Sequence, residues 1–183
     1  MIRTEFVLTH DTAVFLPMYD GTGKLCTLVM ENGEMIEVAI KPNALMDRTL
    51  QYYGSSLQGA SDGAKYILGN TQMNPVWISD SIIWFPSKSA ASDDCVWLAL
   101  HHVERYVPCG KEETEVTLST GSKVVIKCSY YSFDKKVQRA YKLKGTINKR
   151  LELSAATVVK ENIVCYSISK EENSVHYEIK SLD

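Results

Sequence analysis

The stretch LVMENGEMIEVAI, residues 28–40, shows most clearly how this chain folds. Two runs rich in apolar residues, 28–30 and 35–40, flank the dipeptide Asn32-Gly33. A glycine at this place supplies the positive φ that a tight hairpin turn requires, and alternating apolar and polar side chains are typical of a strand with one buried face. The stretch therefore predicts an antiparallel β-hairpin.

The same pattern recurs along the chain, and Thr120-Gly121 marks a second predicted hairpin turn. Short runs rich in Val, Ile, Thr and Tyr predict strands at residues 5–8, 13–16, 28–30, 35–40, 76–78, 82–85, 96–100, 115–118, 123–127, 163–168 and 175–179. Together these runs predict an α+β fold: a β-rich single domain over residues 1–183, with several hairpins and two to three short helices.

Helical spacing of apolar residues occurs in three places. Residues 44–53 end at Gly54, a suitable left-handed C-terminal cap. Residues 55–68 begin with serines that suit an N-cap, although two glycines lower the helix propensity. Residues 132–144 form the third predicted helix, which we expect Gly145 to end.

Composition limits the class of protein. Apolar residues make up 45% of the 183 residues and charged residues 23%, which is ordinary for a globular protein and argues against disorder or a fibrous repeat. No apolar run approaches the roughly 18 residues that span a bilayer. The start, MIRTEFVLTHD, lacks the layout of a signal peptide. We therefore expect a cytoplasmic protein with no membrane partner.

The five cysteines are scattered and form no Cys-x-x-Cys pair, so we expect reduced thiols rather than disulfides or a zinc ribbon. One cluster, Cys95, His101, His102 and Cys109, contains the residue types that bind zinc. Its spacing matches no common zinc module, and strand alternation along residues 94–107 would place neighbouring side chains on opposite faces. We interpret these residues as structural and predict no metal and no cofactor.

A basic segment contrasts with the rest of the chain. The chain has 20 basic and 22 acidic residues, yet residues 135–150 hold seven basic residues and no acid, which leaves a net charge of −9 elsewhere. The seven are Lys135, Lys136, Arg139, Lys142, Lys144, Lys149 and Arg150. On a helical wheel Lys135, Arg139 and Lys142 lie opposite an apolar face made by Phe133, Val137, Ala140 and Tyr141.

Such a face is usually only solvated. Solvated faces, however, normally alternate acids with bases, whereas like charges four residues apart repel each other. A polyanion reverses this repulsion and releases counterions, and the acidic remainder would restrict its binding to one surface. The segment therefore indicates a nucleic-acid or other polyanion site.

The stretch YYGSSLQG, residues 52–59, is a second candidate contact. Ser55 and Ser56 would place hydroxyls and free backbone amides at a helix N-terminus, where phosphate binds well. The alternative is an ordinary capped turn between two helices.

An ordered set of short motifs resembles the ComK family, the competence transcription factors of low-GC Gram-positive bacteria. The set spans residues 41–144 and comprises KP at 41–42, DR at 47–48, YGSS at 53–56 with Gly59, FPSKS at 85–89, CVW at 95–97, SYYSF at 129–133, and Arg139. The resemblance implies an activator of competence genes that binds double-stranded DNA at paired A/T-rich boxes from the minor groove. It also implies dimers that pair into a tetramer, association with the nucleoid, and neither catalysis nor a cofactor.

The chain departs from the family pattern in two places. The family continues GSS into a Gly-Arg pair, whereas Ala60 follows Gly59 here, so a cation is missing unless Lys65 replaces it. The family tail carries a short aromatic-Leu-Tyr-Pro element by which a protease adaptor captures the protein. Residues 152–183 resemble a hairpin without that element, which argues against adaptor-delivered proteolysis.

Two other classes of function compete with DNA binding. A non-enzymatic β-rich interaction module would use the basic helix to bind an acidic protein partner. An enzyme is disfavoured, because DGTGKL at residues 20–25 is too short for a phosphate loop and the four histidines show no nucleophile-and-acid spacing.

Overall fold

The computed structural model describes residues 2–69, 72–79, 81–90, 92–155, 165–170 and 177–181. These residues form three α-helices, one 3-10 helix and eleven strands in antiparallel sheets, which confirms the predicted β-rich α+β class. The chain divides into two compact units, Met1–Lys149 and Arg150–Asp183. None of the helices in this described part has the length and apolar character needed to cross a membrane.

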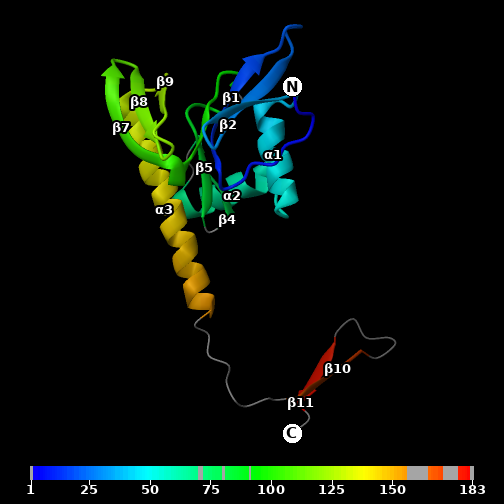
Figure 1. Cartoon of the computed structure of the whole chain (residues 1–183). Coiled ribbons are helices and arrows are strands. Elements are labelled where there is room, and N and C mark those ends of the chain that lie inside the picture. Colours follow the sequence, from blue (N-terminus) through cyan, green and yellow to red (C-terminus); the bar gives the residue numbers. More distant parts are fainter. Residues whose placement is uncertain are drawn as a thin grey trace. The chain divides into compact units, whose positions relative to one another are not determined.

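A six-stranded sheet forms the centre of the first unit, in the order β3-β2-β1-β6-β5-β4 (Figure 1). Its strands are β1 Thr12–Tyr19, β2 Leu25–Glu31, β3 Glu34–Val38, β4 Val76–Ser79, β5 Ile82–Pro86 and β6 Trp97–Ala99. Glu31 pairs with Glu34 across Asn32 and Gly33, whose φ angles are 50° and 82°. The first predicted hairpin is thus confirmed, with both turn residues in the left-handed region.

A three-stranded sheet follows, in the order β7-β8-β9, with β7 Val103–Gly110, β8 Glu113–Leu118 and β9 Lys123–Ile126. Its second turn contains Gly121 at φ 79°, as predicted. The sequence reading had no strand at β7. A 3-10 helix, η1 Leu100–His102, joins the two sheets. In the second unit β10 Tyr166–Ser169 pairs with β11 Glu178–Ser181; parts of the predicted strands at 163–168 and 175–179 lie outside the described residues.

The three α-helices are α1 Pro42–Tyr52, α2 Leu57–Leu68 and α3 Tyr130–Ala155. Gly54 follows α1 at φ 82°, as its predicted capping role requires. The prediction that Gly145 ends the third helix is wrong, because α3 runs 26 residues and passes through it. A glycine inside a helix costs about 1 kcal/mol relative to alanine. Burial of Leu143, two residues earlier, stabilises the helix and offsets this cost.

Residues 5–8 were predicted to be a strand and are not one. The N-terminal segment forms one isolated bridge with the sheet, between Arg3 and Val38. Leu8 is fully buried, and its backbone N–H donates to Thr49 Oγ1 of α1 at 3.1 Å. A helix side chain therefore satisfies the backbone group that a neighbouring strand would otherwise bond.

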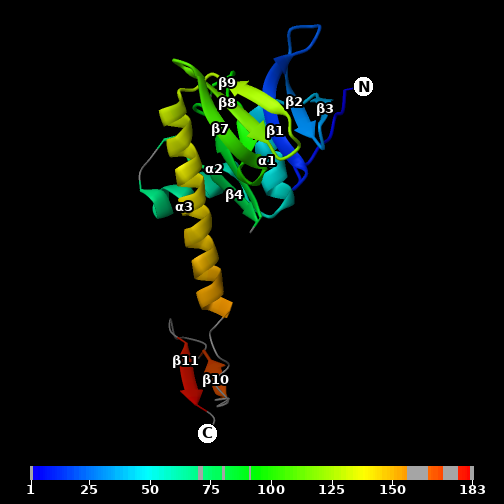
Figure 2. The ribbon, with the colours of Figure 1, turned by 60° about the vertical axis from the view of Figure 1, so that its left-hand side comes forward.

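The core lies on both faces of the six-stranded sheet. Phe15, Trp84 and Trp97 pack with α1 on one face, whereas Phe85 and Leu98 pack on the opposite face. This alternation follows the two-residue period of a strand. The second face is covered by β7–β9 and α3, which runs alongside the three-stranded sheet (Figure 2), and it is this packing that positions the basic segment.

Candidate nucleic-acid interface

One face of α3 is buried. Phe133, Val137, Ala140 and Leu143 are each at most 4% exposed, and the Phe133 ring lies 5.6 Å from the Phe85 ring, centroid to centroid. The wheel also placed Tyr141 on this face, which is wrong, because Tyr141 is 55% exposed. Leu143 completes the packed face instead, so the buried strip of the helix is turned slightly from the predicted one.

The opposite face of α3 presents exposed residues at alternating spacings of four and three: Tyr131, Lys135, Gln138, Lys142, Gly145 and Lys149. We call Lys135, Lys142 and Lys149 the basic stripe. These lysines are seven residues apart, so the stripe extends about 21 Å along the helix. The Lys135 ammonium also lies 4.3 Å from the centre of the Tyr131 ring, which places an aromatic surface beside the first cation of the stripe.

Lys136, which the sequence reading grouped with the DNA-binding cations, points into the protein. It is 6% exposed, and its Nζ donates to the Met73 sulfur at 3.3 Å. Burial lowers the pKa of the Lys136 amine, and the nearby Arg139 lowers it further. Lys136 therefore lies outside the exposed basic surface.

The remaining cations of the segment are placed differently from one another. Arg139 is half-buried, and its Nη1 donates to the backbone carbonyl of Gln72 at 3.4 Å. Lys144 is half-buried and contributes to lowering the pKa of His101. Arg150 is exposed on the last turns of α3, after the boundary of the first unit.

Asp134, the acid that precedes the basic residues, is held by two neighbours. Tyr106 donates its hydroxyl to Asp134 Oδ1 at 2.7 Å, and Gln138 donates its amide to Oδ2 at 2.6 Å. Burial, and next the bond to Asp134, raise the pKa of Tyr106 to about 12. The bond to Tyr106 fixes the start of α3 against β7.

Several backbone amides at the turn of residues 53–56 and the start of α2 are bonded within the protein. The Ser56 hydroxyl accepts from Gly59 N–H at 3.1 Å, and Asp47 Oδ1 accepts from Leu57 N–H at 2.8 Å. The Ser55 N–H is bonded to the Leu50 carbonyl. The local geometry is thus that of the capped turn between helices, with the amides of Ser55, Leu57 and Gly59 already engaged.

The turn nevertheless lies next to α3. Ser55 lines a cavity of about 340 Å³ together with Gly63 of α2 and with Leu143 and Ile147 of α3. Ser55 and the basic helix therefore border one region of the surface. Sequence reasoning had no means to place them together, because 88 residues separate Ser55 from Leu143.

Lys65 lies farther along α2 and is paired with Asp62 at 3.4 Å, with side chains 42% and 57% exposed. It lines a second cavity, which Gln72 also lines, and Gln72 is the residue that Arg139 contacts. Lys65 and Arg139 thus both lie near Gln72. The aromatic neighbour of Lys135, Tyr131, was not among the predicted site residues, although the motif SYYSF contains it.

The cluster of Cys95, His101, His102 and Cys109, interpreted above as structural, is spread over several elements. Cys95 is buried beside the first sheet, whereas Cys109 is exposed on β7. The described residues contain no group of three or more His, Cys, Asp or Glu side chains that could hold a metal ion. The tertiary structure therefore provides no metal site there for the residues it describes.

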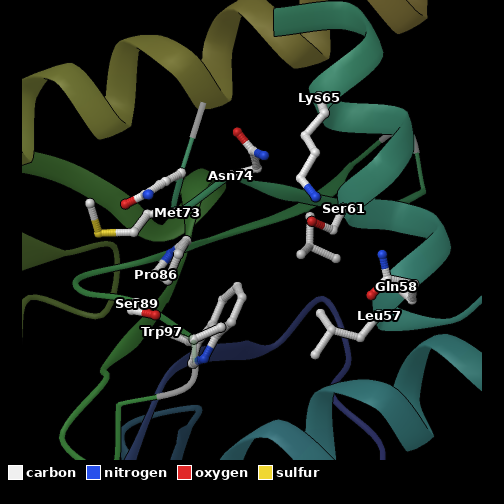
Figure 3. Close-up of a pocket in the computed structure, with 12 residues that line it drawn as sticks. Leu57, Gln58, Ser61, Lys65, Met73, Asn74, Pro86, Ser89 and Trp97 are labelled. Atoms are coloured by element: carbon white, nitrogen blue, oxygen red, sulfur yellow. The ribbon is translucent and has the colours of Figure 1, made fainter. Parts of the chain in front are cut away.

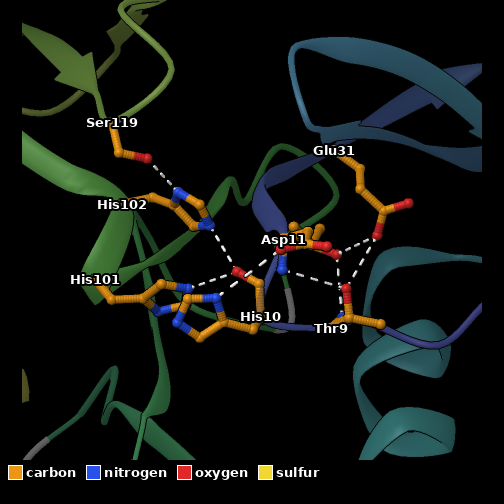
Figure 4. A network of polar contacts seen from close by, with 8 residues as sticks. Thr9, His10, Asp11, Glu31, His101, His102 and Ser119 are labelled. Atoms are coloured by element: carbon orange, nitrogen blue, oxygen red, sulfur yellow. Dashed lines mark hydrogen bonds and ion pairs between the residues drawn. The ribbon is translucent and has the colours of Figure 1, made fainter.

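The two histidines of that cluster instead join the N-terminal segment (Figure 4). His101 and His102 each place Nε2 2.7 Å from the backbone carbonyl of His10, and the rings of His10 and His101 stack at 4.2 Å. Strand alternation would have separated them, but they lie in η1, whose tighter turn puts both rings on one side. Burial lowers the pKa of His101, with smaller contributions from His102, His10 and Lys144.

Comparison with known proteins gives a consistent result. The family model described as ComK protein matches residues 3–152. The competence transcription factor of Bacillus subtilis (strain 168) is 29% identical over 132 residues, which cover 71% of this chain and 69% of that protein. No solved structure gives a significant match.

Proposed function

The chain belongs to the ComK family and is similar to a competence transcription factor. We propose that it activates competence genes by binding double-stranded DNA at A/T-rich boxes. The basic stripe carries the proposal. Three exposed lysines follow one side of a helix whose other side is buried, so the cations are held at fixed spacing toward solvent. Each lysine placed on a phosphate releases counterions and adds affinity.

We assign the contact with DNA to the exposed cations Lys135, Lys142 and Lys149, with Arg139 and Lys144 at the edge of the surface. Arg150, in the second unit, remains a predicted contact. Lys65, Ser55 and Ser56 of the neighbouring region complete the proposed site. Lys136 is withdrawn from it, because a buried amine cannot reach a phosphate.

The minor groove is the proposed place of contact. The basic segment has two amides that could read base edges, and both are poorly placed for it: Gln138 is bonded to Asp134, and Asn148 is half-buried with its Oδ1 fully enclosed. Cations without base readers suit phosphates and the strong negative potential of a narrow A/T-rich minor groove.

The rest of the proposal follows the family. The chain acts as one DNA-binding domain, assembles as a dimer or a dimer of dimers, works in the cytoplasm at the nucleoid, and performs no catalysis. Control by a protease adaptor is not part of the proposal, because the tail lacks the capturing element.

Gel-shift titration against an A/T-box duplex and a scrambled duplex, each at two salt concentrations, tests the function. We expect tighter binding to the A/T-box duplex and a steep loss of affinity with salt. Equal affinity for the two duplexes would contradict sequence-preferring binding. If neither duplex binds, the basic stripe is better explained by an acidic protein partner.

A further inference from the structure

A cavity of about 740 Å³ opens between α2, the loop that precedes β4, and the ends of β5 and β6 (Figure 3). We call it the α2 cavity. Its volume is within the range of about 300 to 1,000 Å³ that is usual for small-molecule sites. The proposed contact with DNA does not account for its interior, since duplex DNA cannot enter a cavity of this size.

The walls of the α2 cavity differ in character. Leu57, Met73 and Ala90 are half-buried and supply accessible apolar surface, whereas Val76, Pro86 and Trp97 are buried behind it. The indole of Trp97 faces Leu57 across the space in Figure 3. Trp97 is 1% exposed and its Nε1 has no hydrogen-bond partner among the described residues. Trp97 therefore offers almost no surface to a ligand, and the apolar contact falls to the half-buried side chains.

The other wall, on α2, is polar. Gln58, Ser61 and Lys65 line it at successive turns of the helix, and Lys65 extends toward Ser61 in Figure 3. Lys65 is the one charged side chain among the described residues that line the cavity. Its partner Asp62 lies outside the lining, and at 3.4 Å between exposed groups this pair is weak, so a ligand anion can compete for the ammonium.

We propose that the α2 cavity binds a small amphipathic anion. A planar apolar body lies against the half-buried side chains of Leu57, Met73 and Ala90, and a carboxylate, sulfonate or phosphate group reaches the Lys65 ammonium and the Ser61 hydroxyl. This division follows the general build of ligand sites, in which apolar surface provides contact area and a few polar groups fix orientation.

One wall of the cavity is bonded directly to α3. Arg139 donates to the Gln72 carbonyl and Lys136 donates to the Met73 sulfur, and both Gln72 and Met73 line the cavity. Met73 also has a φ of 56°, an uncommon conformation for a residue other than glycine. A ligand that displaces this loop changes the contacts of Arg139, so we infer that the cavity is an effector site. This part rests on the proposed DNA-binding function.

Fluorescence titration with 1-anilinonaphthalene-8-sulfonate (ANS) tests the site, because ANS joins a flat apolar body to one anionic group. We expect saturable binding at one site per chain. Lys65→Met should weaken ANS binding about fivefold and leave binding of the neutral analogue N-phenyl-1-naphthylamine unchanged. Lys123→Met is the matched control, because Lys123 also pairs with a carboxylate, Glu115, but lies on β9.

Ser61→Phe provides a second variant, since its ring fills the cavity and should abolish binding of both probes. Absence of saturable ANS binding to the wild type, or binding that neither Lys65→Met nor Ser61→Phe changes, would overturn the site. An equal loss in Lys123→Met would show a non-specific charge effect and would also overturn it. Melting curves of the variants identify any loss of binding that comes from unfolding. If Ser61→Phe is unfolded, the result with Lys65→Met decides whether the site exists.

The effector role is tested by titrating A/T-box duplex with and without saturating ANS. We expect the affinity for duplex to change, the affinity for ANS to change by the same factor when duplex is bound, and both changes to disappear in Ser61→Phe, which binds no ANS and lies outside the proposed contact with DNA. Unchanged duplex affinity at saturation contradicts the effector role. The two proposals fail separately, because ANS binding is measured without DNA and duplex binding is measured without ANS.

Discussion

The amine of Lys136 lies 3.3 Å from the sulfur of Met73, with only 6% of the side chain exposed. A thioether is a weak hydrogen-bond acceptor and carries no charge, and Lys136 forms no ion pair within the described residues. The protein thus buries one member of its basic segment under the loop that lines the α2 cavity, while its neighbour Lys135 is exposed to solvent.

Replacing this lysine by an apolar residue should stabilise the protein. Burial lowers the pKa of Lys136 below its usual 10.5 in the folded state, so between that pKa and 10.5 the unfolded chain binds more protons. The stability of the wild type therefore rises with pH across this window. At pH 7 we expect Lys136→Met to raise the free energy of unfolding by on the order of 1 kcal/mol, and the gain should shrink as pH approaches 10.5.

Urea denaturation at pH 7, 9 and 10 measures this difference. Lys135→Met is the control, since a change at an exposed position should alter stability by less than about 0.5 kcal/mol. A destabilised Lys136→Met at pH 7 would show that the amine contributes more to the fold than its desolvation costs.

Charge reversal along the basic stripe should abolish duplex binding. We expect Lys135→Glu, Lys142→Glu and Lys149→Glu together to eliminate binding while the far-UV spectrum and melting temperature barely change, because all three positions are exposed. Arg139 is excluded from this set, since its contact with Gln72 mixes a structural effect with an electrostatic one.

The control for the stripe carries the same change of net charge at exposed lysines elsewhere: Lys24→Glu, Lys111→Glu and Lys127→Glu. Single changes of stripe lysines to alanine should weaken binding evenly across sequences and reduce the salt slope by about one each. Equal loss of binding in both triple variants would indicate that net charge, rather than the stripe, controls affinity.

The choice of groove is tested with base analogues. Replacing A·T by I·C pairs in the boxes changes the major-groove pattern but adds no amino group in the minor groove. We expect I·C boxes to bind nearly as well as A·T boxes and G·C boxes to bind much more weakly, measured by the same gel-shift titration. I·C boxes that bind as poorly as G·C boxes would favour α3 in the major groove.

The histidines at the junction of the two sheets should make stability depend on pH. Burial lowers the pKa of His101 below 6.5, and the groups that face it are His10, His102 and Lys144. Between the folded pKa and 6.5 the unfolded chain binds more protons, so stability falls as pH decreases through this window. We expect the melting temperature to drop between pH 7 and pH 5, and to drop less in His101→Gln, whose amide can still donate to His10. A parallel pH dependence in the two proteins would assign the effect to other groups.

Removal of metal ions should have no effect. Cys95 is buried and Cys109 is exposed, and the two histidines are bonded to a backbone carbonyl. Exhaustive chelation should therefore leave melting temperature and duplex binding unchanged. A stoichiometric amount of zinc found by elemental analysis would contradict the structural role of these residues.

Local patterns in the sequence were sufficient wherever the deciding interaction is between near neighbours. Asn32-Gly33 and Gly121 mark hairpin turns, Gly54 follows α1, and Ser56 caps α2. The buried face of α3 was predicted from Phe133, Val137 and Ala140. These features depend on backbone conformation and on residue spacing, both of which can be read from one segment.

Contacts between distant segments were decided only by the tertiary structure. Lys136 was assigned to the basic face from its sequence position, but it is buried against Met73. The helix α3 continues through Gly145 because it packs against the rest of the protein. The carbonyl of His10 gathers two histidines more than 90 residues away. A helical wheel or strand alternation describes one element in isolation, whereas burial, pKa and the shape of a cavity depend on which other elements pack against it.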